Sequence, residues 1–266
     1  DINRKLHQKG YGEVRITRQF MGLPPEQNSH TNPYRFINAN GETIYSQPAM
    51  INTDAFDFSR VIKLGKAHMN SRDSIINEPF DFTKHNNLSL ETMLTMLKSV
   101  MFPKSVSARQ RFKLTMEDYT FLYRYLSQYP SETPDPKYDE KAFYDSYVKF
   151  FFRDSTKQMP EGVRVFNKVG WSYGFLTDVS YVADFKNKTE YMLAATLYVN
   201  SDDVLNDGKY DYDTKGYPLL YMLGQAIYNY ELGRKKAYLP DLSSFKVQYE
   251  KRDPADSRAP LKDIDN

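Results

Sequence analysis

Runs of Val, Tyr, Phe and Leu separated by turn residues mark the stretch 163–200. This composition favours β-strands, and the predicted strands are Arg164–Val169, Val179–Asp184 and Tyr191–Val199. The connection between the second and third strands is only Lys186–Lys188, which favours an antiparallel hairpin. The centre of the fold is therefore expected to be a small antiparallel sheet.

Apolar residues at helical spacing predict helices on both sides of this sheet in the sequence. Ser89 is the expected N-cap of one helix. Thr115 caps the next, with Asp118 three residues later in a capping-box arrangement. Gly10 is expected to end the first helix, and Gly233 lies just past the end of the last. The predicted helices are 2–9, 88–101, a segment that begins after Thr115, 139–152 and 217–232.

The region between the first helix and Ser89 is expected to contain loops and extended segments. Glu13–Arg18 alternates apolar with polar residues, and 21–33 is a loop rich in Pro and Asn. Arg35–Ala49 predicts a hairpin around Asn40 and Gly41. Val61–Met69 could supply another extended segment. The stretch 33–79 is treated as an insertion whose role stays open.

Composition excludes several classes of protein and site. The chain has 36 basic and 34 acidic residues, so its formal charge of +2 implies no strong field for nucleic acid. It contains no cysteine, which excludes disulfides, zinc–thiolate sites and cysteine nucleophiles. It has no apolar run long enough to span a bilayer. Absence of cysteine is compatible with both the cytosol and the periplasm.

No metal site or cofactor is expected. The four histidines, His7, His30, His68 and His85, form neither an i,i+4 pair nor an HExxH arrangement. The acidic loop after Asn200 could suggest calcium, with Gly208 in the sixth position of a binding loop. Leu205 and Thr214 would then occupy ligand positions that they cannot serve. A solvated turn is the preferred interpretation.

The candidate chemistry lies at the end of the first predicted strand. Lys168, Val169 and Gly170 are followed by the small and aromatic cluster 171–174, which reads Trp-Ser-Tyr-Gly. A lysine at a strand end could place a positive charge beside an exposed sheet edge. The glycine after it would let the backbone of another segment approach closely. An extended substrate could lie along such an edge. The simpler alternative is a solvated lysine before a turn.

A longer context gives this stretch a resemblance to a known family. Met159–Gly162 precedes the strand that ends at Gly170, and Tyr173–Gly174 leads into a second strand that carries Asp178. This run resembles the third catalytic box of class A β-lactamases and related penicillin-recognising serine hydrolases, where a turn leads into a strand ending Lys-Thr-Gly. The passage 10–18, with Arg15 and Arg18, is similar to the segment that enters the loop flanking that active site.

The resemblance implies an α+β, β-lactamase-like fold that is incomplete at its N-terminus. A helical lobe would lie beside an antiparallel sheet covered by a C-terminal helix. In this division, residues 1–158 form the helical lobe with the inserted hairpin region 33–79. Residues 159–250 form the sheet and terminal helix, and 251–266 form a loose tail.

The resemblance also implies site residues. Lys168 and Gly170 would be catalytic, and Val169, Trp171, Ser172 and Tyr173 would bind substrate. Glu26 is a weaker candidate for the residue that activates the deacylating water, because His30 stands where the family has Asn. Val169 replaces the usual Thr and cannot donate its hydrogen bond to a substrate carboxylate, so antibiotic hydrolysis becomes doubtful.

The nucleophile-bearing boxes of the family are missing. No Ser-Asp-Asn occurs, and the two Ser-x-x-Lys strings, Ser146–Lys149 and Ser243–Lys246, are interpreted as chance matches. The nucleophile is expected upstream of Asp1, so this chain alone is expected to be inactive.

The resulting hypothesis is the C-terminal portion of a serine hydrolase that acts on an ester, amide or β-lactam. Its partners would be an acyl substrate and the missing N-terminal segment of the same protein, and its place would be the periplasm or cell surface. One alternative is a non-catalytic binding or scaffold protein that retains the fold. Another is an unrelated α+β domain in which the box is accidental.

Overall fold

A computed structural model describes residues 2–19, 23–24 and 26–262. The fold is mixed α+β. The α-helices are α1 (Ile2–Gln8), α2 (Leu90–Met101), α3 (Met116–Ser127) and α4 (Tyr217–Gly233). The long strands are β9 (Val163–Ser172), β10 (Phe175–Asp184) and β11 (Thr189–Tyr198). The short strands are β1 (His30–Thr31), β2 (Tyr34–Ile37), β3 (Thr43–Gln47), β4 (Met50–Ile51), β5 (Lys63–Leu64), β6 (Ala67–Met69), β7 (Ile75–Ile76), β8 (Phe80–Asp81) and β12 (Val204–Leu205).

The three long strands form one antiparallel sheet in the order β11-β10-β9, as the sequence predicted. Pairing is regular over all ten residues of each strand, with Gly170 opposite Thr177 and Lys168 opposite Val179. The turn between β9 and β10 is made by Tyr173 and Gly174, which both have positive φ, 52° and 84°. Two such residues give a hairpin turn whose twist matches that of the strands.

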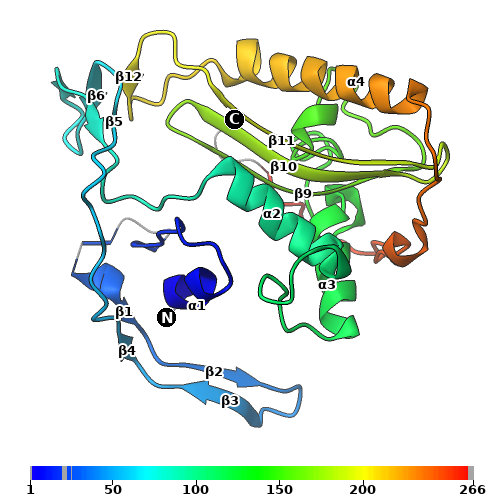
Figure 1. Ribbon diagram of the computed structural model, residues 1–266, viewed down its shortest axis with the longest axis horizontal. Helices are drawn as coiled ribbons and strands as arrows, with labels where there is room; N and C mark the ends of the chain where they lie inside the picture. The colour runs from blue at the N-terminus through cyan, green and yellow to red at the C-terminus, as the bar shows by residue number, and fades with distance from the viewer. Residues whose placement is uncertain (1, 20–22, 25, 263–266) are drawn as a thin grey trace.

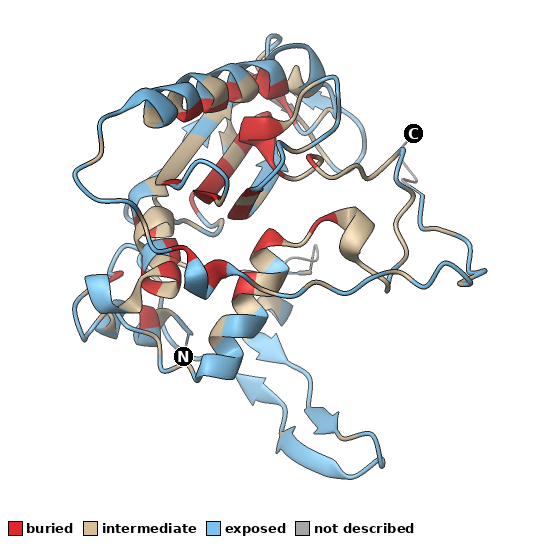
Figure 2. Ribbon diagram, turned by 90° about the vertical axis from the view of Figure 1, so that its right-hand side faces the viewer, coloured by how far each residue is buried: buried red, intermediate tan, exposed pale blue. Residues whose placement is uncertain are grey.

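Helices cover both faces of this sheet (Figure 1). One face packs on α4 and on the 3₁₀ turn η4 (Phe150–Phe152), through buried residues that include Val165, Leu176 and Leu220. The other face packs on α2 and α3 through Phe166 and Tyr181. Since β10 lies in the middle and is covered on both sides, it is buried continuously from Asp178 to Asp184 (Figure 2). Its polar residues Asp178, Ser180 and Asp184 are therefore buried together with its apolar ones.

The region from His30 to Asp81 is built differently. Its strands are short and pair locally, β1 with β4, β2 with β3 and β5 with β8, while β6 pairs with β7 and with β12. The predicted hairpin is confirmed as β2–β3, but both of its strands are exposed over almost their whole length. The hairpin projects away from the sheet (Figure 1).

The predicted helix over 139–152 is wrong. The structure has turns there and only η4 at its end. The Asp139 carboxylate accepts hydrogen bonds from the backbone N–H groups of Lys141 and Ala142, which fixes a turn at the start. At the end, Phe150–Phe152 are all buried, so their side chains do not share one helical face. Glu13–Arg18 likewise forms only an isolated bridge, from Arg15 to Asn87.

Further 3₁₀ turns connect these elements: η1 (Gln27–Ser29), η2 (Pro103–Ser105), η3 (Pro130–Glu132) and η6 (Ser243–Phe245). A π-helical turn, η5 (Tyr212–Gly216), leads directly into α4. Two of the predicted helix starts are confirmed: the Ser89 side chain accepts a bond from Thr92 N–H, and Thr115 and Asp118 form the capping box of α3.

Gly224 lets α4 approach η4 closely. A Cβ atom at this position would lie 2.2 Å from the Phe151 carbonyl oxygen. We expect Gly224→Ala to lower the free energy of unfolding by about 1–3 kcal/mol, because backbone must move to relieve the overlap. Chemical denaturation measures this. Gly233→Ala in the same helix is the control, since a Cβ there meets nothing within 4 Å. Equal effects of the two changes would contradict this packing.

Candidate functional site

Lys168 lies on the exposed part of β9, which is an edge strand of the sheet. Its ammonium group donates a hydrogen bond to the Val169 carbonyl oxygen at 2.5 Å. Two residues further on, a Cβ atom at Gly170 would meet nothing within 4 Å, so the space above this backbone is open. The strand end therefore combines a solvent-accessible cation with unobstructed backbone.

Two aromatic residues flank this strand end. Trp171 is 44% exposed, and its ring packs against Phe150 and Tyr147 with centroids 6.0 and 6.4 Å apart. Tyr173, in the turn, packs instead against Phe80 and Phe82, at 5.2 and 5.1 Å. The exposed part of Trp171 can therefore contact a ligand beside the strand end. Tyr173 instead fixes the turn to the segment that contains β8.

Threonine hydroxyl groups extend the polar surface on the same face as Lys168. Thr177 is the cross-strand partner of Gly170, and Thr196 is the partner of Thr177 on β11. Their hydroxyl groups are 2.8 Å apart and hydrogen-bonded. Because side chains on paired strands share a face, Thr177 lies diagonally across from Lys168. Sequence reasoning did not identify these threonines, since their placement depends on the strand register.

The arginine pair of the 10–18 segment is brought to the same end of the sheet. Arg18 Nη1 lies 2.8 Å from His85 Nε2, and the His85 ring packs against Tyr173 at 6.2 Å. Burial, together with the positive charge of Arg18, lowers the pKa of His85. Arg15 has a structural role, since its Nη2 donates to the Thr83 carbonyl oxygen.

Glu26 makes its contacts within its own loop. It precedes the turn η1, and its backbone carbonyl oxygen interacts with the His30 ring at 2.7 Å and accepts from the Ser29 hydroxyl. No contact between its carboxylate and Lys168 or Gly170 occurs among the described residues. Val169 lies next to Lys168 on β9, and the strand runs on to Ser172, three residues beyond the end that the sequence predicted.

A second group of polar residues lies inside the fold. Lys149 is buried, and its ammonium group donates to the carbonyl oxygens of Leu126 and Val165, both at 2.9 Å, and to Asn167 Oδ1 at 2.6 Å. The Asn167 amide in turn donates to Asp178 Oδ1 at 2.9 Å. We call Lys149, Asn167, Asp178 and Ser180 the buried polar cluster.

Asp178 is fully satisfied within this cluster. It accepts hydrogen bonds from Asn167, from the Ser180 hydroxyl at 2.6 Å and from the backbone N–H of Phe150 at 3.0 Å. Burial disfavours the charged form of each end, so it raises the pKa of Asp178 to about 6 and lowers the pKa of Lys149 to about 7.

The two Ser-x-x-Lys strings do not form accessible nucleophile sites. Ser146 and Lys149 are 0% and 2% exposed, and the Ser146 hydroxyl has no hydrogen-bond partner among the described atoms. The lysine is committed to the buried polar cluster. Ser243 begins η6. Lys246 lines a cavity at the Val163 end of β9, whereas Lys168 lies near the other end of that strand.

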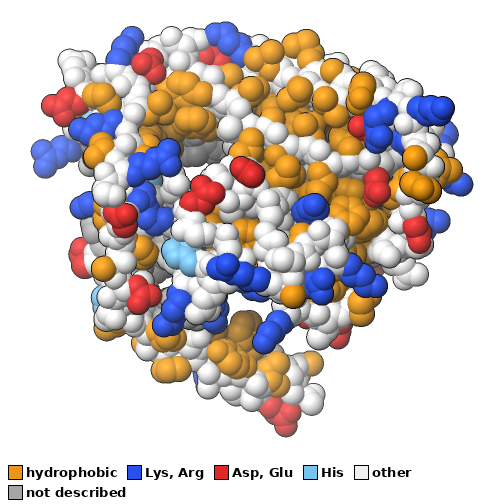
Figure 3. Space-filling view, viewed as in Figure 1, with side chains coloured by type: hydrophobic (Ala, Val, Ile, Leu, Met, Phe, Trp, Pro, Cys, Tyr) orange, Lys and Arg blue, Asp and Glu red, His pale blue; other side chains and the backbone are white. Residues whose placement is uncertain are grey.

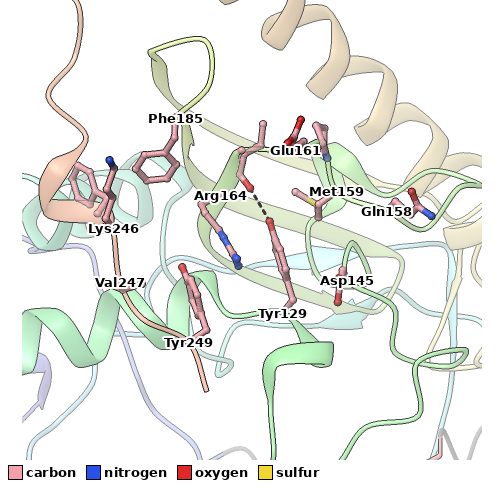
Figure 4. A pocket seen from close by; sticks show the side chains of 14 residues that line it. Tyr129, Asp145, Gln158, Met159, Glu161, Arg164, Phe185, Lys246, Val247 and Tyr249 are labelled. Carbon is pink, nitrogen blue, oxygen red and sulfur yellow. Dashed lines mark hydrogen bonds between the residues drawn. The ribbon is translucent and has the colours of Figure 1, made fainter. Parts of the chain in front are cut away.

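That cavity, of about 740 Å³, lies at the opposite end of β9 (Figure 4). Arg164 crosses it between the rings of Tyr129 and Tyr249, at 4.3 and 4.0 Å, and forms a bidentate ion pair with Glu132. Its guanidinium is already occupied, so the arrangement is one that holds the loop after α3 against the strand. Lys168 and Trp171 are not among its lining residues.

Comparisons with known proteins give no relative: no protein-family model, no curated protein and no solved structure matches this chain. Within the part of the chain that the structure describes, no group of three or more His, Asp or Glu residues is placed to hold a metal ion. A search of the same residues finds no helix with the length and apolarity needed to cross a membrane.

The buried polar cluster should set a pH dependence of stability. The pKa of Asp178 is higher in the folded protein than in the unfolded chain, so protonation of its carboxyl group favours folding. This contribution to the free energy of unfolding is fully present below pH 3.8 and is lost as the pH rises through about 6. The pKa of Lys149 is lower in the folded protein, so the neutral amine favours folding. This contribution is fully present above pH 10.5 and is lost as the pH falls through about 7. Their joint contribution to the free energy of unfolding is therefore lowest between about pH 6 and pH 7.

Urea unfolding across pH 4 to 10 measures this profile. The double variant Lys149→Met, Asp178→Asn should flatten it, because neither replacement titrates. Lys168→Met, which removes an exposed lysine, should leave the profile as it is. An unchanged profile in the double variant would show that the pair does not titrate in the folded protein.

Proposed function

We propose that this chain is part of a β-lactamase-like serine hydrolase, in which the Lys168 end of β9 forms one wall of an acyl-binding cleft. The observation that carries the proposal is the accessible Lys168 ammonium beside open space at Gly170, on an edge strand of the sheet. An extended ester, amide or β-lactam substrate can add to such an edge through its own backbone-like groups.

The charge at this edge suits a substrate with an anionic group. The Lys168 ammonium attracts a carboxylate, and Val169 offers no hydroxyl to complete its binding. The Thr177 and Thr196 hydroxyl groups, on the same face, are alternative donors. Trp171 lies on the opposite face of β9, against Phe150, and so borders the strand edge from the other side. This surface binds and orients substrate but contains no activated hydroxyl.

The nucleophile is supplied from outside the residues described. Acyl transfer in this family needs a serine whose hydroxyl is activated by a lysine of depressed pKa. The buried pair Ser146 and Lys149 cannot meet a substrate, since both are shielded from solvent. We propose that the complete enzyme works at the cell surface or in the periplasm, as the family resemblance suggests.

A non-catalytic binding protein is the second candidate. No serine–lysine hydrogen bond lies at the Lys168 end of β9 among the described residues, since the exposed pair Ser201 and Lys215 belongs to the segment after β11. This favours a binding protein, because the same edge can hold an extended ligand without reacting. The two candidates differ in whether a covalent acyl-enzyme ever forms.

The 266-residue chain should not be acylated by a fluorescent penicillin or a fluorophosphonate. The Ser146–Lys149 pair is buried, and the exposed Ser201, which accepts a hydrogen bond from Lys215, donates its own hydroxyl to Asp211 Oδ2. Intact mass spectrometry after incubation measures this directly. A stoichiometric adduct on any serine within residues 1–266 would contradict the proposal.

In a polypeptide that also carries the nucleophile, Lys168→Ala should slow acylation by about 10- to 100-fold, since a charged donor to the bound substrate is lost. Lys209→Ala, at another exposed lysine, is the control and should acylate at the normal rate. An absence of any adduct in that polypeptide would favour the binding protein. An adduct that forms equally fast in both variants would remove Lys168 from the site.

A further inference from the structure

The outer edge of β11 is unpaired. Among the described residues β11 pairs only with β10, and no other backbone hydrogen bond reaches residues 190–198. One row of N–H and C=O groups along a ten-residue strand therefore faces outward. Such a row is a template for another strand.

This edge lacks the features by which proteins normally protect a sheet edge. The strand reads Thr-Glu-Tyr-Met-Leu-Ala-Ala-Thr-Leu-Tyr, with Glu190 as its one charged residue and no proline or lysine. Its pairing with β10 is regular, without a bulge. The opposite edge strand, β9, carries both Arg164 and Lys168. An apolar, regular and uncovered edge is suited to strand addition rather than to solvent.

The apolar surface continues from β11 onto α4. Tyr191, Leu193 and Leu197 are only partly buried although they pack against the α4 core. Residues 217–233 of α4 contain a single charged side chain, Glu231, and leave several large apolar side chains exposed: Leu219, Met222, Leu223 and Tyr230. Hydrophobic side chains gather over α4 and on the surface below it (Figure 3).

The charges at the two ends of β11 are opposite in sign. Lys188 lies in the turn before the strand, and Asp202 lies in the turn after it. Both are exposed, and neither forms an ion pair in the part of the chain that is described. An antiparallel neighbour with the same sequence would bring its acidic end to the basic end of this strand, whereas parallel pairing would bring like charges together.

We propose that two copies of this chain associate through the outer edges of β11 in antiparallel register. The pairing makes one continuous sheet across the two copies, with α4 beside α4 of the second copy. A second copy is the occupant that matches the edge on three counts: unprotected backbone, apolar residues on both faces and opposite charges at the two ends. Both β9 edges stay outermost, so this interface leaves the Lys168 end of β9 uncovered.

Light scattering after gel filtration, over a range of micromolar concentrations, tests the association. We expect a concentration-dependent dimer. Thr196→Lys places a cation on the exposed part of β11 and should weaken the dimer at least tenfold. Ser172→Lys makes a comparable change on exposed β9 and should leave the dissociation constant unchanged. Thermal unfolding of each variant checks that it is folded.

A second test exchanges the charges of Lys188 and Asp202, which lie in the turns on either side of β11, and so leaves the strand itself unaltered. Lys188→Glu and Asp202→Lys should each raise the dissociation constant about 3- to 10-fold, because two attractive pairs become repulsive in a two-fold dimer. The double variant should regain the original value. Hydrogen exchange should show the alternate outward amides of β11 protected only in the dimer.

A monomer at all concentrations would overturn the proposal. If its outward β11 amides were nevertheless protected, another segment would be the occupant. A dimer that is insensitive to both Thr196→Lys and the charge exchange would also overturn it, because another surface, such as the exposed β2–β3 hairpin, would then hold the copies together.

Discussion

The hydrogen bonds that join Lys149, Asn167 and Asp178 hold together parts of the chain that are otherwise separate. They connect the segment before η4, the end of α3 at Leu126, and the two strands β9 and β10. Each charged atom has partners, so the cost of burying it is offset only while all the partners are present. The position of η4 under α4, and with it the close approach at Gly224, depends on this arrangement.

The same cluster explains the main difference between the expected and the observed fold. The strands and the caps of α2 and α3 were predictable, because they depend on local composition and on side chains three residues apart. Residues 139–152 have phenylalanine and tyrosine at helical spacing, yet they do not form a helix. A lysine buried by long-range bonds to β9 sets the chain's path there, and such bonds leave no signal in the local sequence.

For the candidate site, the sequence could place Lys168 at the end of an exposed strand, because a strand and a following turn define that position. It could not place Thr177 beside it, since that requires the register of β10. The contact between Arg18 and His85 joins positions 67 residues apart, and it too could not be predicted from the sequence. Residues that share a strand were thus predictable, and residues that meet across strands or segments were not.

The turn at Tyr173 has a consequence for how the two parts of the molecule influence each other. Its ring is held by Phe80, Phe82 and His85, which belong to the thinly packed region before α2, while its backbone closes the hairpin that ends in Trp171 and Ser172. Residues 80–85 and the end of β9 are therefore joined through the packing of this one ring. The small sheets before α2 thus have a side-chain connection to the strand end, although none of their strands belongs to the central sheet.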